Sequence, residues 1–411
     1  MTSETLQCSH FGRCGGCSRL DQPIELQLED KRDAAMAQLA PFLDGIEPAI
    51  TLPPRPPRYD RISITYPVQP RRRGPMAGIY RRGTHQVEPI RDCRIQHRAL
   101  TTFGARANDV LHRVGVEAYD ERTGKGAVRA IRARVLPGSN ELLVGAVVNT
   151  MRFNGRDAMF DGLWDAAHDL RGDQGQALKP VGAVCNLNDK PGNTLLGAEN
   201  TAFYGRDWQE HVVQPDLRFR VSFASFYQLH RHADAVLFRP AMAMLGGDGE
   251  LRGGLLSGLR IVDGYGGVGS FALRLLAAGA GHVTLIEASP GACRDARHNL
   301  SHNESTSADR PEGSWQDRWE VREQPFGSQP LPECDVLVVD PPRKGLGQEG
   351  AAAVLTAMPP KVLLISCAIG SLARDLEQLS PHYRVAALRL CDLFPHTEHI
   401  EAVTLLERRD S

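Results

Sequence analysis

Four side chains that could support acid–base or nucleophilic chemistry each stand at the end of a short apolar run in the last part of the sequence. They are Asp263, Glu287, Asp340 and Cys367. Helix-like segments alternate with these runs, and this alternation predicts a parallel, doubly wound α/β sheet. Ligands bind outside the carboxyl ends of the strands in such sheets. We therefore expect the four side chains to converge on one cleft.

Cys367 is the candidate nucleophile. It lies between a predicted strand and a helical segment around Ser371 to Leu376, where the positive end of a helix dipole favours a thiolate. An inert buried cysteine is the commonest alternative for a free cysteine. Glu401 precedes the final predicted strand beside the same cleft, where it could handle a proton or be an ordinary strand residue.

A glycine-rich segment, Asp263-Gly264-Tyr265-Gly266-Gly267-Val268-Gly269, follows the first of these strands. Glycines let the backbone turn tightly and approach a ligand, and the acid Glu287 after the next strand can accept hydrogen bonds from ribose hydroxyls. The pattern predicts a nucleotide-like cofactor. It does not identify the cofactor, because a nicotinamide dehydrogenase would show much the same segment.

Asp340 is followed by Pro341, Pro342 and Arg343. Two prolines directly after a buried strand stiffen the backbone and fix the carboxylate at the cleft. Acid-Pro-Pro at this place is typical of enzymes that methylate nucleobases. In those that methylate amino groups an aromatic residue usually follows the prolines, and here Arg343 takes that place.

Cysteines crowd the N-terminus as Cys8-x5-Cys14-x2-Cys17, and Cys93 is the plausible fourth member of the set. Four thiolates suit either zinc or an iron–sulfur cluster, and the spacing leaves both open. The remaining cysteines lack such a setting and are interpreted as structural: Cys185, Cys293, Cys334 and Cys391.

The segment 55–98 is strongly basic, with 11 arginines against three acidic residues. Tyr59, Tyr66 and Tyr80 are interleaved with the arginines. Basic side chains contact phosphates and aromatic rings stack on unpaired bases, so the segment is a candidate RNA-contacting surface. A solvated, charged hairpin is the simpler alternative.

The composition bounds the class of protein. The 411 residues are 42% hydrophobic with a formal net charge of −1, which indicates a globular chain and excludes a uniformly basic nucleic-acid binder. No apolar stretch is long enough to span a membrane, and we expect a soluble, cytoplasmic protein.

We expect three parts: residues 1–98 with the cysteines and arginines, a mixed α+β domain at 99–224, and the α/β domain at 225–411. The proline-rich segment 53–57 is expected to be a hinge between segments.

With these segments in order, the sequence resembles the RNA uracil-C5 methyltransferases, which make 5-methyluridine in ribosomal and transfer RNA. The glycine-rich segment resembles the cofactor loop, Ser366-Cys367 with Leu372-Ala373-Arg374-Asp375 the nucleophile motif, and the segment 394–401 the motif that carries the base. Phe226-Tyr227-Gln228 resembles the entry to the catalytic domain. The sequence departs from the family pattern at three positions: Gly266, Ala368 and His230.

The resemblance implies a Rossmann-like class I methyltransferase domain that uses S-adenosylmethionine. It implies that Cys367 adds to C6 of the uracil and that Glu401 removes the C5 proton. It also implies cofactor contacts by Gln228, Tyr265 and Glu287, with Asp340 holding the cofactor or the uracil. The N-terminal cysteines resemble the ligands of a [4Fe-4S] cluster: Cys8, Cys14, Cys17 and Cys93.

Only seven residues precede Cys8, so we expect no N-terminal RNA-binding barrel. Bacterial relatives of this layout act on 23S ribosomal RNA, which we expect to be the substrate of a monomeric enzyme. The T-loop of transfer RNA is the alternative substrate. A nicotinamide dehydrogenase and a non-catalytic, cluster-bearing RNA-binding protein are the alternatives from other classes.

Overall fold

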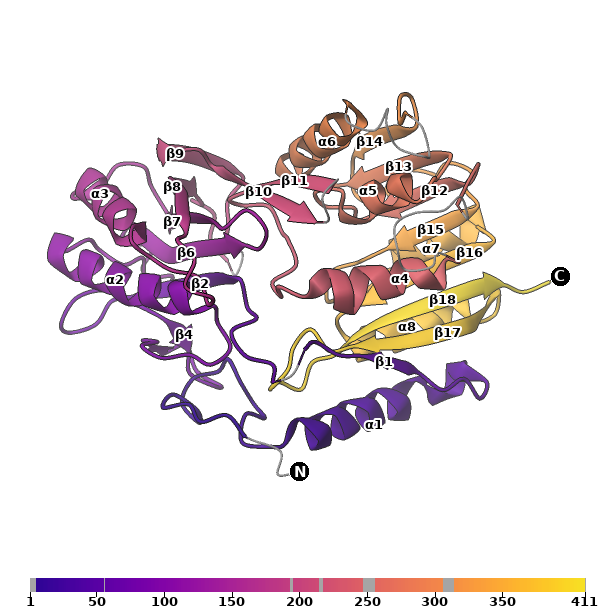
Figure 1. Cartoon of the computed structure of the whole chain (residues 1–411), viewed down its shortest axis with the longest axis horizontal. Coiled ribbons are helices and arrows are strands. Elements are labelled where there is room, and N and C mark those ends of the chain that lie inside the picture. Colours follow the sequence, from indigo (N-terminus) through magenta and orange to yellow (C-terminus); the bar gives the residue numbers. More distant parts are fainter. Residues whose placement is uncertain are drawn as a thin grey trace. The chain divides into compact units, whose positions relative to one another are not determined.

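The computed structural model describes residues 5–54, 56–192, 195–213, 217–246, 256–305 and 314–410. The described residues form two compact units, shown with the chain coloured along its length in Figure 1. Unit 1 takes its residues from the ranges 1–23, 55–212 and 219–231, and unit 2 from 24–54, 213–218 and 232–411.

Unit 2 is built on an eight-stranded sheet. Five parallel strands carry the predicted α/β pattern: β12 (Arg260–Gly264), β13 (His282–Glu287), β14 (Trp319–Glu323), β15 (Val336–Val339) and β16 (Lys361–Ser366). Their order in the sheet is β16-β15-β12-β13-β14. The order reverses beside β12, as the doubly wound prediction requires, and the Rossmann-like fold is confirmed.

Helices connect these strands. Right-handed crossovers run in opposite directions from β12, so α5 (Ser270–Ala277) and α6 (Pro290–Ser305) cover one face, and α7 (Gly347–Ala357) and α8 (Ile369–Leu379) the other. A short π-helix (Asp234–Phe238) and α4 (Arg239–Met244) precede β12. The central strands β15 and β16 are almost wholly buried, which explains their continuous apolar sequences.

The sheet is not purely parallel. β18 (Glu401–Arg408) lies between β16 and β17 (Tyr383–Cys391) and is antiparallel to both. β1 (Ala49–Thr51) completes this edge by pairing in parallel with β17. The expectation of a parallel sheet therefore holds only for the strands up to β16.

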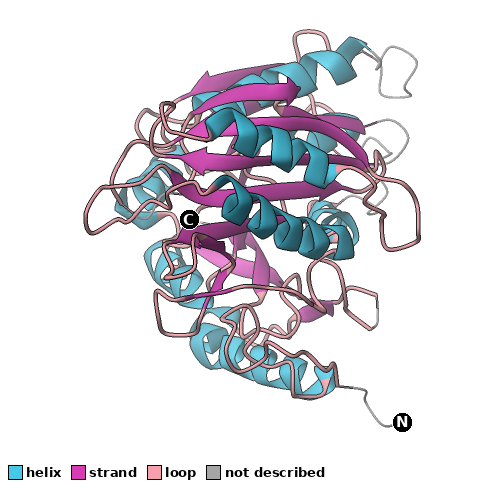
Figure 2. Ribbon diagram, turned by 90° about the vertical axis from the view of Figure 1, so that its left-hand side faces the viewer, coloured by secondary structure: helices cyan, strands magenta, loops and turns pink. Residues whose placement is uncertain are grey.

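Unit 1 contains a six-stranded sheet. Its strands, in spatial order, are β3 (Met76–Ala77), β2 (Ser63–Gln69), β6 (Val128–Leu136), β7 (Glu141–Val148), β8 (Lys179–Leu187) and β9 (Glu199–Gly205). β6 and β7 pair in antiparallel fashion around the turn at 137–140, whose Pro-Gly-Ser-Asn sequence favours a hairpin. Helices α2 (Arg98–Val114) and α3 (Arg156–Ala167) pack together against the sheet and lie in front of it in Figure 2.

Two smaller sheets accompany these elements. β4 (Ile79–Tyr80) and β5 (Val87–Glu88) form a hairpin within the arginine-rich segment. β10 (Trp208–Val213) pairs with β11 (Leu217–Ser222), whose burial alternates as its sequence predicts.

The boundaries of the two units differ from those of the three parts expected from the sequence. The long helix α1 (Ile24–Leu43) packs against α8, and β1 pairs with β17, so residues 24–54 belong to unit 2 and not to an N-terminal part. The change of unit falls within the proline-rich segment 53–57. Arg55 of this segment lies outside the described residues.

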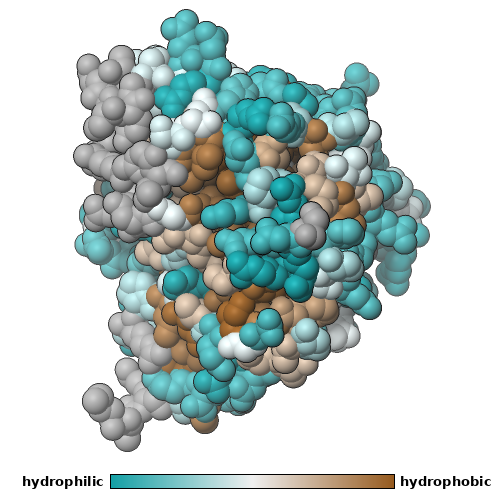
Figure 3. All heavy atoms as spheres, turned by 90° about the vertical axis from the view of Figure 1, so that its right-hand side faces the viewer, coloured by the Kyte–Doolittle hydropathy of each residue, from teal (hydrophilic) through white to brown (hydrophobic). Residues whose placement is uncertain are grey.

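No helix in the described parts of the chain has the length and apolar character needed to cross a membrane. On the molecular face shown in Figure 3, hydrophobic side chains form separate patches between hydrophilic ones. Lys31 and Asp392 make a fully buried ion pair of 2.8 Å that joins α1 to the segment after β17.

Candidate active site

The loop after β12 has the backbone that its glycines predict. Tyr265, Gly267 and Gly269 all have positive φ angles, of 59°, 55° and 88°. The buried Asp263 carboxylate accepts the Ala272 N–H at 2.9 Å, which ties the end of β12 to the first turn of α5. Burial raises the pKa of Asp263 to about 8. The loop is thus held at both ends.

Glu287 stands at the end of β13, as predicted, and faces this loop. Its Oε2 accepts the Gly267 N–H at 3.1 Å, and its Oε1 accepts the Ser289 N–H at 2.7 Å. These bonds fix the carboxylate beside the glycine loop. A carboxylate so placed at a carboxyl strand end suits the ribose hydroxyls of a nucleoside cofactor.

Gly266 departs from the family pattern for a steric reason. A Cβ at this position would lie 2.5 Å from Leu285 Cγ, on the neighbouring strand β13. Leu285 is fully buried and fills the space that a side chain at position 266 would need.

We expect Gly266→Ala to lower the affinity for S-adenosylmethionine, the cofactor that the family resemblance implies, about tenfold or more. The melting temperature should also fall, because the loop must shift away from Leu285. Calorimetric titration and thermal unfolding measure the two effects. The double variant Gly266→Ala/Leu285→Ala removes the clash and should recover affinity. A single variant with unchanged affinity would contradict this steric account.

The loop after β15 carries Asp340 and is anchored to α8. The Leu346 N–H donates to Asp375 Oδ2 at 3.0 Å, and Ser371 Oγ donates to the Arg343 carbonyl oxygen at 2.6 Å. Burial raises the pKa of Asp340 to about 6. Sequence reasoning identified the Asp340 carboxylate but missed the anchoring role of Asp375, which the helical motif after Cys367 could have indicated.

Cys367 and Glu401 lie at the same edge of the sheet because β16 and β18 run in opposite directions. In the antiparallel pair of β16 and β18, Ser366 lies opposite Ala402, so the residue after β16 and the first residue of β18 share one edge of the sheet (Figure 1). Both Glu401 and Asp340 act electrostatically on the Cys367 thiol. The predicted convergence of Asp340, Cys367 and Glu401 is therefore present in the structure.

The electrostatics of Cys367 differ from the sequence-based expectation. Burial raises the pKa of the half-buried thiol, the carboxylates of Glu401 and Asp340 raise it further, and Arg343 lowers it. The expected thiolate-stabilising effect of the start of α8 is outweighed by these groups. Arg343, which the sequence marked only as a replacement for an aromatic residue, is the cation that opposes them.

Glu401 is 4% exposed, and its Oε2 has no hydrogen-bond partner within the described structure. Burial, and to a smaller extent Asp340, raise the pKa of this carboxyl to about 8. A base with a pKa near the working pH is suited to proton transfer.

The raised pKa of Glu401 predicts a pH-dependent stability. Below the unfolded-state pKa of about 4.5 the carboxyl is protonated in both states. Between that value and about 8 the unfolded state loses its proton while the folded state keeps it, so stability falls as the pH rises. We expect Glu401→Gln to unfold several degrees higher than wild type at pH 8, and to differ little at pH 5. Thermal unfolding across this range tests it, and equal melting temperatures at pH 8 would contradict it.

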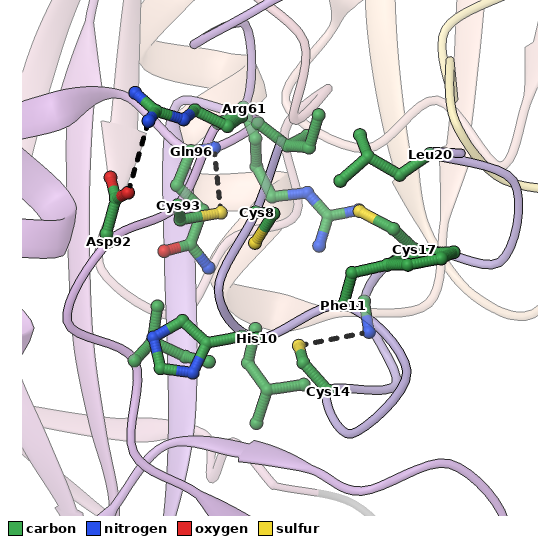
Figure 4. Close-up of a pocket in the computed structure, with 15 residues that line it drawn as sticks. Cys8, His10, Phe11, Cys14, Cys17, Leu20, Arg61, Asp92, Cys93 and Gln96 are labelled. Atoms are coloured by element: carbon green, nitrogen blue, oxygen red, sulfur yellow. Dashed lines mark hydrogen bonds and ion pairs between the residues drawn. The ribbon is translucent and has the colours of Figure 1, made fainter. Parts of the chain in front are cut away.

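The four predicted cysteine ligands lie around one cavity of unit 1 (Figure 4). Cys14 Sγ accepts the Gly16 N–H at 3.3 Å, and Cys93 Sγ accepts the Gln96 N–H at 3.4 Å. Burial and the neighbouring cysteines raise the pKa of Cys14 and Cys93, and that of Cys17 to about 12. The other cysteines outside the candidate active site are buried, as expected: Cys185, Cys293, Cys334 and Cys391.

This grouping does not by itself make a metal centre. Among the described residues, no set of three or more His, Cys, Asp or Glu side chains is arranged so that it could hold a metal ion. The structure thus brings the four cysteines to one cavity without confirming that they bind a metal. Gln228, the remaining predicted cofactor contact, belongs to unit 1, whereas Tyr265, Glu287 and Asp340 belong to unit 2.

Comparison with known proteins decides the family. The model of the tRNA (uracil-5-)-methyltransferase family matches residues 331–409, which include Asp340, Cys367 and Glu401. An uncharacterized RNA methyltransferase of Gloeobacter violaceus is 30% identical over 407 residues, covering 98% of this chain and 82% of the relative. One of Listeria monocytogenes is also 30% identical, covering 97% and 83%. The chain belongs to the RNA uracil-C5 methyltransferase family.

The fold agrees with this membership. The crystal structure of Pyrococcus abyssi tRNA (uracil-54, C5)-methyltransferase with S-adenosyl-L-homocysteine matches with a TM-score of 0.69 at 20% identity, over 98% of this chain and 88% of that one. As a member of the RNA uracil-C5 methyltransferase family, the protein is an S-adenosylmethionine-dependent RNA methyltransferase. Membership of a methyltransferase family excludes the two alternatives from other classes, a nicotinamide dehydrogenase and a non-catalytic RNA-binding protein.

Proposed function

We propose that the enzyme methylates C5 of a specific uridine in 23S ribosomal RNA through a covalent adduct between Cys367 and C6 of the base. The observation that carries this proposal is the placement of Cys367 and Glu401 at the same edge of the sheet, on the paired strands β16 and β18, with Asp340 acting on both.

The chemistry requires these two groups in turn. C5 of uracil is a poor nucleophile, so the Cys367 thiolate first adds to C6 and makes C5 an enolate carbon. S-adenosylmethionine supplies the electrophilic methyl group. The C5 proton then passes to the Glu401 carboxylate, and the electron pair of the C5–H bond expels the Cys367 sulfur from C6. The products are 5-methyluridine, S-adenosylhomocysteine, the Cys367 thiolate and protonated Glu401.

The thiol must lose its proton before it attacks. Arg343 supports this step because it lowers the pKa of Cys367, whereas Glu401 raises that pKa only while the glutamate is charged. Since the pKa of Glu401 is itself raised to about 8, a large fraction of Glu401 is neutral at pH 7. Thiolate formation at Cys367 is therefore favoured in molecules whose Glu401 holds a proton, and we propose that an incoming uracil meets this state. Glu401 must then lose its proton to solvent after the thiolate has added to C6, so that its carboxylate is free to accept the C5 proton.

The cofactor would be held by the loop after β12. We assign the ribose hydroxyls to Glu287, which two backbone N–H groups already fix in place, and we assign a cofactor contact to Tyr265. Asp340 is assigned to holding the uracil or the cofactor. The assignment of Gln228 stays a prediction from the family resemblance.

We further propose that Cys8, Cys14, Cys17 and Cys93 hold a [4Fe-4S] cluster. All four line one cavity, all four are free thiols, and thiolates are the donors that such clusters prefer. Arg61 lines the same cavity and lowers the pKa of Cys17 and Cys93, which helps these thiols to ionise.

The cluster would join the N-terminal segment to the arginine-rich segment around Cys93. We expect Cys93→Ser to lose iron and RNA affinity while the chemical step at saturating RNA changes little, because the cysteine lies outside the residues assigned to catalysis. Iron and sulfide analysis of anaerobically purified protein should give about four irons per chain in the wild type. A colourless wild-type protein that holds one zinc ion would overturn the cluster assignment.

The proposed substrate is 23S ribosomal RNA. This assignment rests on the family resemblance and on the arginine-rich segment, which offers phosphate contacts to looped-out RNA. Mapping of 5-methyluridine in total RNA from a deletion strain tests it. Loss from 23S ribosomal RNA with transfer RNA unchanged supports the proposal, and loss from the transfer RNA T-loop would assign the enzyme to that substrate instead.

A further inference from the structure

Unit 1 contains a second cavity, of about 570 Å³, that none of the assigned catalytic, cofactor or cysteine residues line. Its walls come from the end of β2, the hairpin of β4 and β5, and the loop before β6. This volume lies in the range of small-ligand sites. The cavity is also bordered by the arginine-rich segment, through Arg71 and Tyr80.

Two tyrosine rings line this cavity in different ways. The guanidinium of Arg129 lies 4.4 Å from the centroid of the Tyr119 ring and is fixed by bonds of 2.7 Å to two backbone carbonyl oxygens. Tyr80 is 37% exposed, and His85 meets its ring edge to face, with the centroids 6.0 Å apart. Tyr80 thus offers a ring on which an unpaired base can stack.

The acidic groups of the cavity also differ from each other. Asp120 is neutralised by Arg122, which lies 3.2 Å away and donates its backbone N–H at 2.9 Å. Glu121 has no hydrogen bond or ion pair in the described structure. Glu121 and Tyr80 line the same cavity. Burial raises the pKa of Tyr80, and the charge of Glu121 raises it further.

A free carboxylate beside a stacking ring selects among bases. Guanine presents two neighbouring N–H donors, N1–H and N2–H, which match the two oxygens of a carboxylate. Uracil presents a single N–H between two carbonyl oxygens, which the carboxylate would repel. A phosphate is disfavoured at the same place, whereas the exposed arginines 71–73 after β2 can take the phosphates on either side of the base.

From this arrangement we propose that the cavity binds a guanine of the RNA substrate outside the methylated uridine, stacked on Tyr80 and hydrogen-bonded to Glu121. The inference rests on the enzyme acting on RNA, and it adds a base-selective site to the phosphate contacts of the arginine-rich segment. The cavity would add to substrate specificity, because it would accept a guanine at a second position of the RNA, apart from the uridine that binds at the catalytic residues.

Nucleotide binding to the whole enzyme tests the cavity directly. Saturating S-adenosylhomocysteine fills the cofactor site, and saturation-transfer NMR then compares guanosine 5′-monophosphate with uridine 5′-monophosphate. We expect guanosine monophosphate to bind at least fivefold tighter, and Glu121→Gln to remove most of this preference. Binding of guanosine monophosphate that is unchanged by Glu121→Gln would overturn the proposal. Uridine monophosphate bound at the Cys367 site should be unaffected by this substitution.

Methylation kinetics on RNA from the deletion strain give a second, independent test. Tyr80→Ala should raise KM at least tenfold with kcat unchanged, whereas Tyr80→Phe keeps the ring and should behave as wild type. A Tyr80→Ala variant with wild-type KM would refute the stacking role. These measurements do not depend on whether ribosomal or transfer RNA is the substrate, so an error in that assignment would leave this test interpretable.

Discussion

Replacement of Cys367 by alanine should abolish RNA methylation and leave S-adenosylmethionine binding intact. The thiol is the nucleophile that makes C5 of uracil reactive, and none of the side chains that act on it can replace a sulfur nucleophile. The loss should exceed a thousandfold, because without the adduct the reaction loses its covalent route altogether. Transfer of a tritiated methyl group to unmodified RNA measures the loss, and calorimetry with the cofactor shows that the loop after β12 is unaffected.

Trapping of the covalent protein–RNA adduct tests whether Cys367 is the nucleophile. RNA that contains 5-fluorouridine has no C5 proton to lose, so the wild-type enzyme should remain bound to it covalently after methyl transfer. Cys367→Ala should give no adduct that survives denaturing electrophoresis. Cys293→Ala, which removes a buried cysteine of the same unit that lies on α6, is the matched control and should still form the adduct. An undiminished adduct with Cys367→Ala would remove the residue from the proposed role.

Glu401→Gln should accumulate the covalent adduct with natural RNA, whereas Cys367→Ala should form none. Adduct formation and methyl transfer need the cysteine, whereas the release of RNA needs a base for the C5 proton. Glutamine keeps the shape of the side chain and cannot accept that proton. We therefore expect methylated RNA to accumulate as a covalent complex, with turnover reduced by about 10²–10⁴-fold.

The buried position of Glu401 makes this variant interpretable. The residue is only 4% exposed, and the charge of Asp340 helps to raise the pKa of its carboxyl. Water therefore has little access to Glu401 and cannot readily replace it as the base. Denaturing electrophoresis of enzyme with labelled RNA detects the complex. If Glu401→Gln turns over at the wild-type rate and forms no complex, the base lies elsewhere, and Asp340 becomes the next residue to substitute.

The side chains at the ends of parallel strands were predictable from the sequence. Short apolar runs mark buried strands, and the carboxyl ends of parallel strands meet at one edge, so Asp263, Glu287, Asp340 and Cys367 could be assigned to one region before any coordinates existed. The role of Glu401 as the base for the C5 proton followed from the family resemblance, and the sequence offered no physical reason for the position of Glu401 at this edge of the sheet. Its physical cause is the antiparallel direction of β18, because a parallel strand would begin at the opposite edge of the sheet.

Other features depend on distant parts of the chain and could not be predicted from local patterns. The pKa of Cys367 is raised by burial and by the carboxylates of Glu401 and Asp340, whereas the sequence suggested only the local effect of the start of α8. The fit of Gly266 depends on Leu285 of a neighbouring strand. The assignment of residues 24–54 to unit 2 depends on pairing with a strand near the other end of the chain.

That pairing has a consequence for how the protein is made. β1 joins the sheet beside β17, with Ala49 opposite Arg389, and Lys31 is buried against Asp392. A ribosome therefore releases α1 and β1 long before it synthesises the strand and the carboxylate that complete their environment. During this interval α1 and β1 lack their packing and pairing partners, while most of unit 1 can already fold. A fragment that begins at residue 225 would lack this cover, leave the edge of β17 open to pairing with other chains, and bury Asp392 without its lysine.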